Sequence, residues 1–264
     1  HTAKGQRGFD KTYKIVRYKE KNTFLIGTRA GVAVLDYDTK SFQYLFNKSD
    51  VKTSLGPGPC RLVFESKSGQ YYVAPSSGGL YEIYVDESGS FNVRKPEKFK
   101  LLSGVTKDYL TSALENEPGI YWFGTLGDGL IRYNVNTQQI KSFGKTEGLP
   151  NNVIYGVEWS PSDPDHLWLS TNRGVVAMNI NSRQFHIFTE KDGLMSNELN
   201  LGASFVAKND EVYFGGILGY NYIDPSEAFR KNSELKVYFS GIEVENKTIF
   251  PKNSDLLSQS IAFT

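Results

Sequence analysis

One pattern recurs along the whole chain and constrains its fold. An apolar run leads to a Gly-rich turn, a second apolar run, an Asn/Thr turn and a third run that ends on Phe, most clearly in YWFGTLGDGLIRYNVNTQQIKSF at 121–143. The turn glycines of the five copies are Gly31, Gly79, Gly129, Gly174 and Gly219, at intervals of 48, 50, 45 and 45 residues. A unit of this size cannot bury both of its faces alone, so the copies must stack on one another.

Aromatic and β-branched runs bounded by Gly and Asn predict short strands joined by hairpins. Four such strands every 45–50 residues are typical of a β-propeller blade. The predicted fold is therefore all-β, with blades of four antiparallel strands and five repeats visible, as part of a seven-bladed propeller or as a five-bladed one. The fifth unit lacks a clear fourth strand, and 224–229 resembles an N-capped helical turn. Propensity allows a helix at 110–115, but the equivalent runs 153–159 and 202–206 favour a strand.

Two further features of the repeat give structural expectations. The large aromatic residues of the second strands are expected to fill the space between blades, because burial of such rings stabilises packing of sheet on sheet. These residues are Tyr72, Trp122, Trp168 and Tyr213. The segment 160–165 holds two prolines and is expected to be a loop, because Pro has no N–H for the ladder.

Composition excludes several classes of function. The formal net charge is +1 and no polybasic run is present, which argues against nucleic acid as a partner. No run of about 18 apolar residues exists, so no membrane contact is expected within this segment. The single Cys60 excludes an internal disulfide and a Cys-based zinc cluster. His1, His166 and His186, expected at a terminus, a turn and a strand, lack metal-ligand spacing. We therefore expect no cofactor and no metal.

The repeat resembles a known family. Trp122–Phe143 with Glu147–Asn152, and Trp168–Phe188 with Asp192–Asn197, are similar to the two-component regulator propeller repeat. Unit five resembles the closing repeat of that array, and unit two departs from it because Ala74-Pro75 replaces Gly-Thr. The sequence after Val237 resembles the start of the triple-tyrosine, immunoglobulin-like domain that follows the propellers in the family. The predicted division is propeller blades at 1–234 and the start of an immunoglobulin-like β domain at 235–264.

The resemblance implies the extracytoplasmic, periplasmic sensor of a membrane-bound receptor, usually a hybrid histidine kinase, that responds to an oligosaccharide or another small molecule and signals to transcriptional output. The family carries two successive seven-bladed propellers, whereas five units are seen here, so the chain is expected to be the C-terminal part of the second propeller. The segment is expected to be non-enzymatic and to form a homodimer through the trailing domain.

The residues themselves point to a candidate ligand-binding rim. In a propeller, the loops between second and third strands share one face with the loops between blades, and Arg, Asn, Asp and Glu there could bind sugar hydroxyls while a Tyr ring stacks. The candidate residues are Arg29, Asp128, Asn152, Asn172, Arg173, Asn197, Glu198 and Tyr220. No catalytic residue is predicted.

Three alternatives stay open. The Asn residues could simply satisfy turn geometry. The acidic residues could form a carboxylate pair, which would make the protein a propeller lyase or hydrolase. The blades could also form a scaffold that binds protein and no small molecule.

Overall fold

The structure, a computed structural model, describes residues 11–19, 22–45, 58–76, 79–102 and 109–229, together with the backbone of 242–244 and 247–249. The chain divides into two compact units, His1–Ala228 and Phe229–Thr264. In the second unit the structure describes an antiparallel pair, β20 (Ile242–Val244) and β21 (Lys247–Ile249). The immunoglobulin-like domain and the domain boundary at 234 stay predictions.

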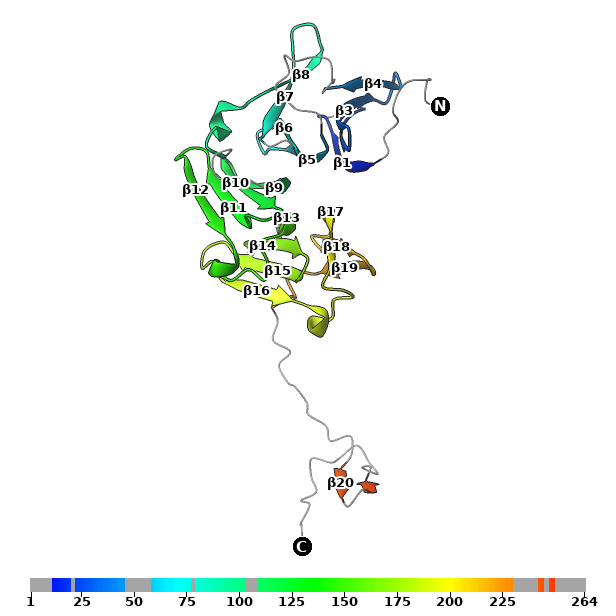
Figure 1. Cartoon of the computed structure of the whole chain (residues 1–264), viewed down its shortest axis with the longest axis vertical. Coiled ribbons are helices and arrows are strands. Elements are labelled where there is room, and N and C mark those ends of the chain that lie inside the picture. The colour runs from blue at the N-terminus through cyan, green and yellow to red at the C-terminus, as the bar shows by residue number, and fades with distance from the viewer. Residues whose placement is uncertain are drawn as a thin grey trace. The chain divides into compact units, whose positions relative to one another are not determined.

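The first unit is an all-β propeller of five antiparallel blades (Figure 1), as predicted. Blade one holds β1 (Thr12–Arg17), β2 (Thr23–Thr28), β3 (Gly31–Asp36) and β4 (Ser41–Tyr44). Blade two holds β5 (Cys60–Glu65), β6 (Tyr71–Pro75), β7 (Tyr81–Val85) and β8 (Phe91–Arg94). Blade three holds β9 (Leu110–Glu117), β10 (Ile120–Thr125), β11 (Leu130–Asn134) and β12 (Gln139–Phe143). Blade four holds β13 (Ile154–Ser160), β14 (Asp163–Thr171), β15 (Gly174–Asn179) and β16 (Phe185–Phe188), and blade five β17 (Leu199–Val206), β18 (Val212–Gly216) and β19 (Gly219–Ile223).

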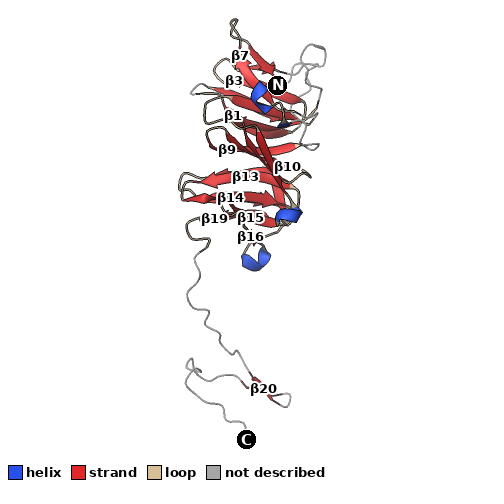
Figure 2. Cartoon of the chain, turned by 90° about the vertical axis from the view of Figure 1, so that its left-hand side faces the viewer, coloured by secondary structure: helices blue, strands red, loops and turns tan. Residues whose placement is uncertain are grey.

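Two of the predictions about individual units are confirmed. Leu110–Glu117 is a strand and not a helix. Blade five has three strands among the described residues, and after it Asp224 accepts hydrogen bonds from the backbone and side chain of Ser226 in a turn. Figure 2 shows strand throughout this unit, with helix in short 3-10 turns such as η1 (Glu97–Phe99), η2 (Lys145–Glu147) and η3 (Glu190–Asp192).

The first strands of the blades surround a common axis. β1 lies against β5, β5 against β9, β9 against β13 and β13 against β17. The later strands of each blade lie progressively farther from the axis, so the sheets fan outward (Figure 1). β17 also approaches β1, since a Cβ placed on Gly202 would lie 3.6 Å from the carbonyl oxygen of Tyr13.

Four hydrophobic clusters fill the spaces between consecutive blades. Tyr72 and Trp122 are each 1% exposed and Trp168 is 0% exposed, and each contacts apolar side chains of the following blade. The inter-blade prediction is therefore confirmed for these three residues. It is wrong for Tyr213, which is half-buried and stacks on Phe205 and Tyr222 of its own sheet, because no described blade covers that face of blade five.

The loop predicted at 160–165 is also wrong. β13 ends at Ser160 and β14 begins at Asp163, so the turn is only Pro161-Ser162, and Pro164 lies in β14. The strand tolerates this proline because the pairing of β13 with β14 is irregular between Glu158 and Ser160, and a residue at a bulge owes no ladder hydrogen bond. His166 consequently lies within β14 and not in a turn, whereas His186 lies in β16 as expected.

Candidate ligand-binding rim

A buried threonine fixes the turn that carries several of the candidate residues. In blade four, Thr171 Oγ1 donates to the carbonyl of Gly174 (2.8 Å) and accepts from the backbone N–H of Arg173 (2.9 Å). Thr125 makes the same two bonds, to Gly129 and Asp128, and Thr28 makes them to Gly31 and Ala30. These threonines are at most 1% exposed. Each turn is thus fixed by the buried threonine at the end of the preceding strand of its own blade.

The turn glycine is required by backbone geometry and by space. Gly174 has φ +97°, and a Cβ there would lie 2.1 Å from the carbonyl oxygen of Phe188 in the fourth strand. Gly129 has φ +79° and the same 2.1 Å clash with the carbonyl oxygen of Phe143. The turn therefore lies directly against the backbone of β12 or β16, and only glycine fits.

The loops between blades use their polar side chains to fix their own 3-10 turns. Asn152 Oδ1 accepts from the N–H of Lys145 (2.9 Å), and Asn197 Oδ1 accepts from the N–H of Glu190 (2.8 Å). These bonds support the interpretation that the side-chain oxygens of the two Asn residues satisfy turn geometry.

The capping carboxylates of the same loops are held ionised. Glu147 accepts from the N–H of Gly144 (2.6 Å), and Asp192 accepts from the N–H of Thr189 (2.9 Å). Because these bonds favour the charged form, the Gly144 N–H lowers the pKa of Glu147 and the Thr189 N–H lowers the pKa of Asp192.

Backbone hydrogen bonds connect each strand-joining turn to the next loop between blades. The N–H of Gly129 donates to the Asn152 carbonyl (2.9 Å), and the N–H of Gly174 donates to the Asn197 carbonyl (2.7 Å). The N–H of Ile217 donates to the Glu198 carbonyl (3.4 Å). The rim therefore brings Asp128 beside Asn152, Asn172 and Arg173 beside Asn197, and the Tyr220 hairpin beside Glu198. Arg29 occupies the equivalent turn of blade one, where its N–H donates to the Lys11 carbonyl (3.0 Å).

The exposure of these side chains determines which of them can contact a ligand. Arg29, Arg173, Glu198 and Tyr220 are exposed, and Tyr220 is exposed to 64%. Asp128, Asn152, Asn172 and Asn197 are half-buried. The side-chain oxygen of Asn172 is buried and has no hydrogen-bond partner among the described residues, so it is not among the groups the rim presents to solvent. The rim can therefore supply charged donors, acceptors and an aromatic plane.

A cavity of about 720 Å³ beside the Tyr220 hairpin was not predicted. Its walls are apolar and include Leu194, Met195 and Tyr222, with Asp192 and Asp224 also among its lining residues. It lies between the loop that leaves blade four and the outer strand of blade five. The candidate Tyr220 lines it too, so the cavity joins the predicted rim at that position.

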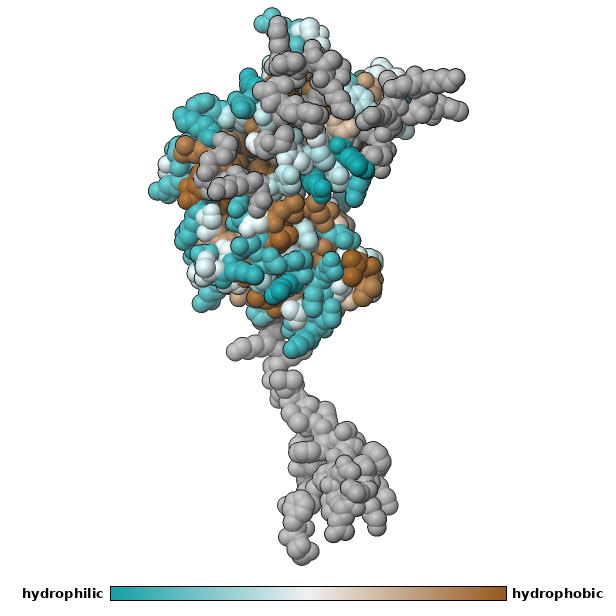
Figure 3. Space-filling model, in the orientation of Figure 1, coloured by the Kyte–Doolittle hydropathy of each residue, from teal (hydrophilic) through white to brown (hydrophobic). Residues whose placement is uncertain are grey.

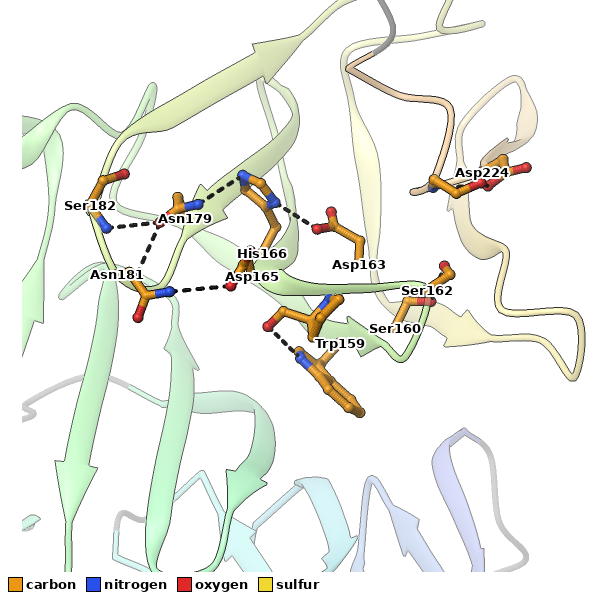
Figure 4. A network of polar contacts seen from close by, with 12 residues as sticks. Trp159, Ser160, Ser162, Asp163, Asp165, His166, Asn179, Asn181, Ser182 and Asp224 are labelled. Carbon is orange, nitrogen blue, oxygen red and sulfur yellow. Dashed lines mark hydrogen bonds and ion pairs between the residues drawn. The ribbon is translucent and has the colours of Figure 1, made fainter.

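The opposite end of blade four carries a polar network that sequence reasoning missed (Figure 4). His166 Nδ1 lies 2.8 Å from Asp163 Oδ1, and Asn179 Nδ2 lies 3.3 Å from His166 Nε2. Asn179 Oδ1 accepts from the N–H groups of Asn181 and Ser182. Both ring nitrogens of His166 are engaged, so this Asp–His pair fixes two hairpins and does not offer a general base. The sequence signal that could have revealed the network is the spacing of Asp163 and His166, three residues apart in one strand.

A carboxyl group near the axis was also not predicted. Glu158 Oε1 of β13 accepts from Ser204 Oγ of β17 at 2.8 Å. Burial raises the pKa of Glu158, while the Ser204 hydroxyl and the charge of Lys14 oppose that rise. The bond ties two first strands together. Within the described ranges, no three His, Cys, Asp or Glu residues gather as a metal site, and no helix is long and apolar enough to cross a bilayer.

The chain is similar to known proteins in part of its sequence and in its fold. No known family profile matches the chain. A stretch of 101 residues is 36% identical to "Histidine kinase P4" of Formosa agariphila. The matched stretch is 38% of this chain and 7% of the kinase.

Solved structures extend the likeness to the fold of most of the chain. It is similar to the extracellular domain of a putative hybrid two-component system from B. thetaiotaomicron, with a TM-score of 0.67 and 17% identity over 87% of this chain and 30% of that one. The extracellular domain of a putative one-component system from the same organism gives a TM-score of 0.61 and 18% identity, over 84% of this chain and 28% of that one. The chain thus spans less than a third of either structure and a small fraction of the kinase.

Proposed function

We propose that this chain is an extracytoplasmic, ligand-sensing segment of a membrane-bound two-component receptor, with a periplasmic location and a hybrid histidine kinase as its output. The observation that carries the proposal is the 36% identity to a histidine kinase over 101 residues. The likeness of the fold to extracellular domains of two-component and one-component systems supports it. Because the sequence identity to those structures is only 17% and 18%, the similarity extends to the fold alone. The function therefore needs its own test.

The proposed ligand is an oligosaccharide bound at the rim. Exposed guanidinium groups of Arg29 and Arg173 can donate to sugar hydroxyls, and Asp128 and Glu198 can accept from them. The exposed ring of Tyr220 offers a plane for the apolar face of a sugar. The threonine bonds to the backbone of Arg173 and Gly174 hold this turn in place before a ligand arrives. Such preorganisation reduces the entropic cost of binding.

Signalling requires a second conformational state that the ligand favours. We propose that the chain forms a homodimer through residues 235–264 and that ligand binding favours one arrangement of that dimer, by its difference in affinity for the two. The transcriptional output would lie in the histidine kinase and its partners. This part of the proposal predicts a ligand-dependent change in sedimentation of the dimer.

Binding of an oligosaccharide panel to the chain, measured by isothermal titration calorimetry, tests the proposal. Arg173→Ala should weaken binding about tenfold, as expected for loss of a charged hydrogen bond. Lys208→Ala is the matched control, because it removes an exposed positive charge from the β17–β18 turn, at the end of blade five that lies away from the rim. Equal affinity of both variants would move the site away from the rim. Turnover of the glycan would show an enzyme, and no binding to any glycan would favour the protein scaffold.

A further inference from the structure

The first strands of blades one to four each carry a β-bulge near the rim. In β5 the pairing passes from Cys60 to Leu62 while β6 advances by one residue, so Arg61 has no partner in β6. The same irregularity leaves one residue unpaired in three other first strands: Tyr13 in β1, Thr111 in β9 and Tyr155 in β13. In blades one, three and four, the threonine that fixes the rim turn pairs with the residue just before the bulge. The bulges therefore lie at one level around the axis, beside the rim.

The bulge in β5 removes Arg61 from both faces of its blade. Side chains of a regular strand alternate between the two faces, so residues two apart share one face. Cys60, however, packs in the cluster between blades one and two, and Leu62 packs in the cluster between blades two and three. Cys60 and Leu62 are at most 3% exposed, whereas Arg61 is half-buried and belongs to neither cluster. A bulge re-aims a side chain in this way, so the guanidinium is not part of an inter-blade core.

Two cations approach the ring of the neighbouring bulge residue. The Arg61 Cζ atom lies 4.9 Å from the centroid of the Tyr13 ring, and the Lys11 Nζ atom lies 5.5 Å from it. Both distances are within the roughly 6 Å range of a cation–π interaction. β1 and β5 contact each other near the axis (Figure 1), and Figure 3 shows hydrophilic surface over β1, in contrast to the apolar surface over the β18–β19 hairpin. Tyr13 thus fixes two positive charges close together.

Neither cation is balanced by an acid. Among the described residues, Lys11 and Arg61 form no ion pair, and the buried Nε of Arg61 has no hydrogen-bond partner. Arg94 of the same blade shows the contrast, because its Nε and Nη2 atoms each donate to the Glu82 carboxylate at 2.9 Å. A buried N–H without an acceptor costs free energy, so an arginine that serves only structure is expected to be paired as Arg94 is. The arrangement around Tyr13 favours an added anion.

Backbone hydrogen bonds connect this cluster to the rim. The carbonyl of Lys11 accepts from the N–H of Arg29, a candidate rim residue, at 3.0 Å. The carbonyl of Pro59, two residues before Arg61, accepts from the N–H of Ser76 in the rim turn of blade two at 2.7 Å. A ligand on the rim of blades one and two would therefore lie beside Arg61 and Lys11.

We propose that Arg61 and Lys11 bind the carboxylate of an acidic sugar in the ligand, while the Tyr13 ring holds both cations in position. The parallel N–H groups of a guanidinium match the two oxygens of a carboxylate, and the ammonium of Lys11 adds a point charge. The assignment to a sugar rests on the proposed function. Recognition of the anion rests on the two cations alone.

Titration of the chain with D-glucuronate and D-galacturonate, followed by saturation-transfer difference NMR, tests the proposal. Either acid should bind saturably, and D-glucose and D-galactose should not. Arg61→Gln should weaken binding of the acid about tenfold, as expected for loss of a charge-assisted hydrogen bond. Lys11→Gln should weaken it about threefold, since ion pairs of exposed side chains contribute less. Arg183→Gln is the matched control, because this exposed guanidinium also lies over a ring, 5.8 Å from that of Phe143, but in the β15–β16 turn at the outer strands.

Several results would overturn the proposal: no saturable binding of either acid, equal binding of acids and neutral sugars, or equal losses in Arg61→Gln and Arg183→Gln. Acetate or inorganic sulfate that binds as tightly as the sugar acids would show a general anion site and overturn the assignment to a sugar. Should Arg61→Gln fail to fold, an unchanged affinity in Lys11→Gln would count against the site.

This proposal and the sensor proposal fail separately. Binding of a neutral oligosaccharide that depends on Arg173 but not on Arg61 would keep the sensor and overturn the acid site. Binding of the sugar acids that depends on Arg61 but not on Arg173 supports the acid site, even where no oligosaccharide binds the rest of the rim.

Discussion

Trp168 and Tyr213 occupy the same place in consecutive copies of one repeat, yet their surroundings differ completely. Trp168 is 0% exposed between blades four and five, and it stacks on Phe188 of its own fourth strand at 5.7 Å. Tyr213 has no fourth strand beside it among the described residues, and its stacking partners are exposed. The repeat thus encodes an aromatic side chain for a contact that only a neighbouring blade can complete. The sequence of one unit does not determine the burial of its own residues.

The largest expected effect comes from replacing Trp168, the buried residue of this pair. Trp168→Ala removes a fully buried ring and leaves a cavity between two blades, which should lower the free energy of unfolding by about 3–5 kcal/mol. Tyr213→Ala should lower it by less than about 1 kcal/mol, because the ring is half-exposed already. Urea denaturation followed by tryptophan fluorescence for Tyr213→Ala, and by circular dichroism for both, measures the difference. Equal losses would mean that the face of blade five is covered in solution.

The turn glycines give the second comparison. Gly174→Ala places a Cβ at 2.1 Å from the Phe188 carbonyl at a positive φ, and should cost about 3 kcal/mol. At Gly219, with φ +131°, the nearest atoms to a Cβ belong to the Met195 side chain at 3.6 Å, because no fourth strand lies there among the described residues. Gly219→Ala should therefore cost only backbone strain, about 1–2 kcal/mol. Thermal unfolding of the two variants measures both, and a larger loss at Gly219 would contradict the open edge of blade five.

The smallest effect concerns the loop at the boundary between blades four and five. The pKa of Asp192 is lowered in the folded state by the Thr189 N–H, so its stabilising contribution is present above the unfolded pKa of about 3.9. That contribution is lost as pH falls through the folded pKa. Asp192→Asn should lower stability slightly at pH 7 and flatten the loss of stability below about pH 4. Acid titration followed by circular dichroism tests this, and Glu147→Gln in the matching loop of blade three should behave alike. An unchanged acid profile in both variants would contradict the capping role.

Much of the fold was predictable from the spacing of the repeat. Turn glycines at about 45-residue intervals predicted the blades, and the flanking aromatics predicted three of the inter-blade contacts. Tyr213 could not be predicted correctly, because its burial depends on a neighbour that its own unit does not specify. Pro164 was misjudged because a bulge, which the sequence does not reveal, releases the strand from needing its N–H.

The candidate site was predictable only as a location. Topology placed Asp128, Arg173 and Asn197 on one rim, and backbone bonds between turns and loops bring their segments together. The roles of Thr125 and Thr171 were not predicted, although the threonine recurs in the motif, because a hydroxyl that both donates and accepts is recognised only once the turn is closed. Whether the rim binds a sugar depends on side-chain positions that spacing does not determine, and that prediction still awaits measurement.

The threonine beneath each rim turn has an evolutionary consequence. Since Thr171 anchors its turn through backbone atoms of Arg173 and Gly174, these hydrogen bonds do not depend on the exposed side chain at 173. A descendant could exchange that residue, or lengthen the turn to the form seen around Thr125, and keep the threonine anchor. Recognition could then diversify one blade at a time while the architecture beneath it is inherited intact.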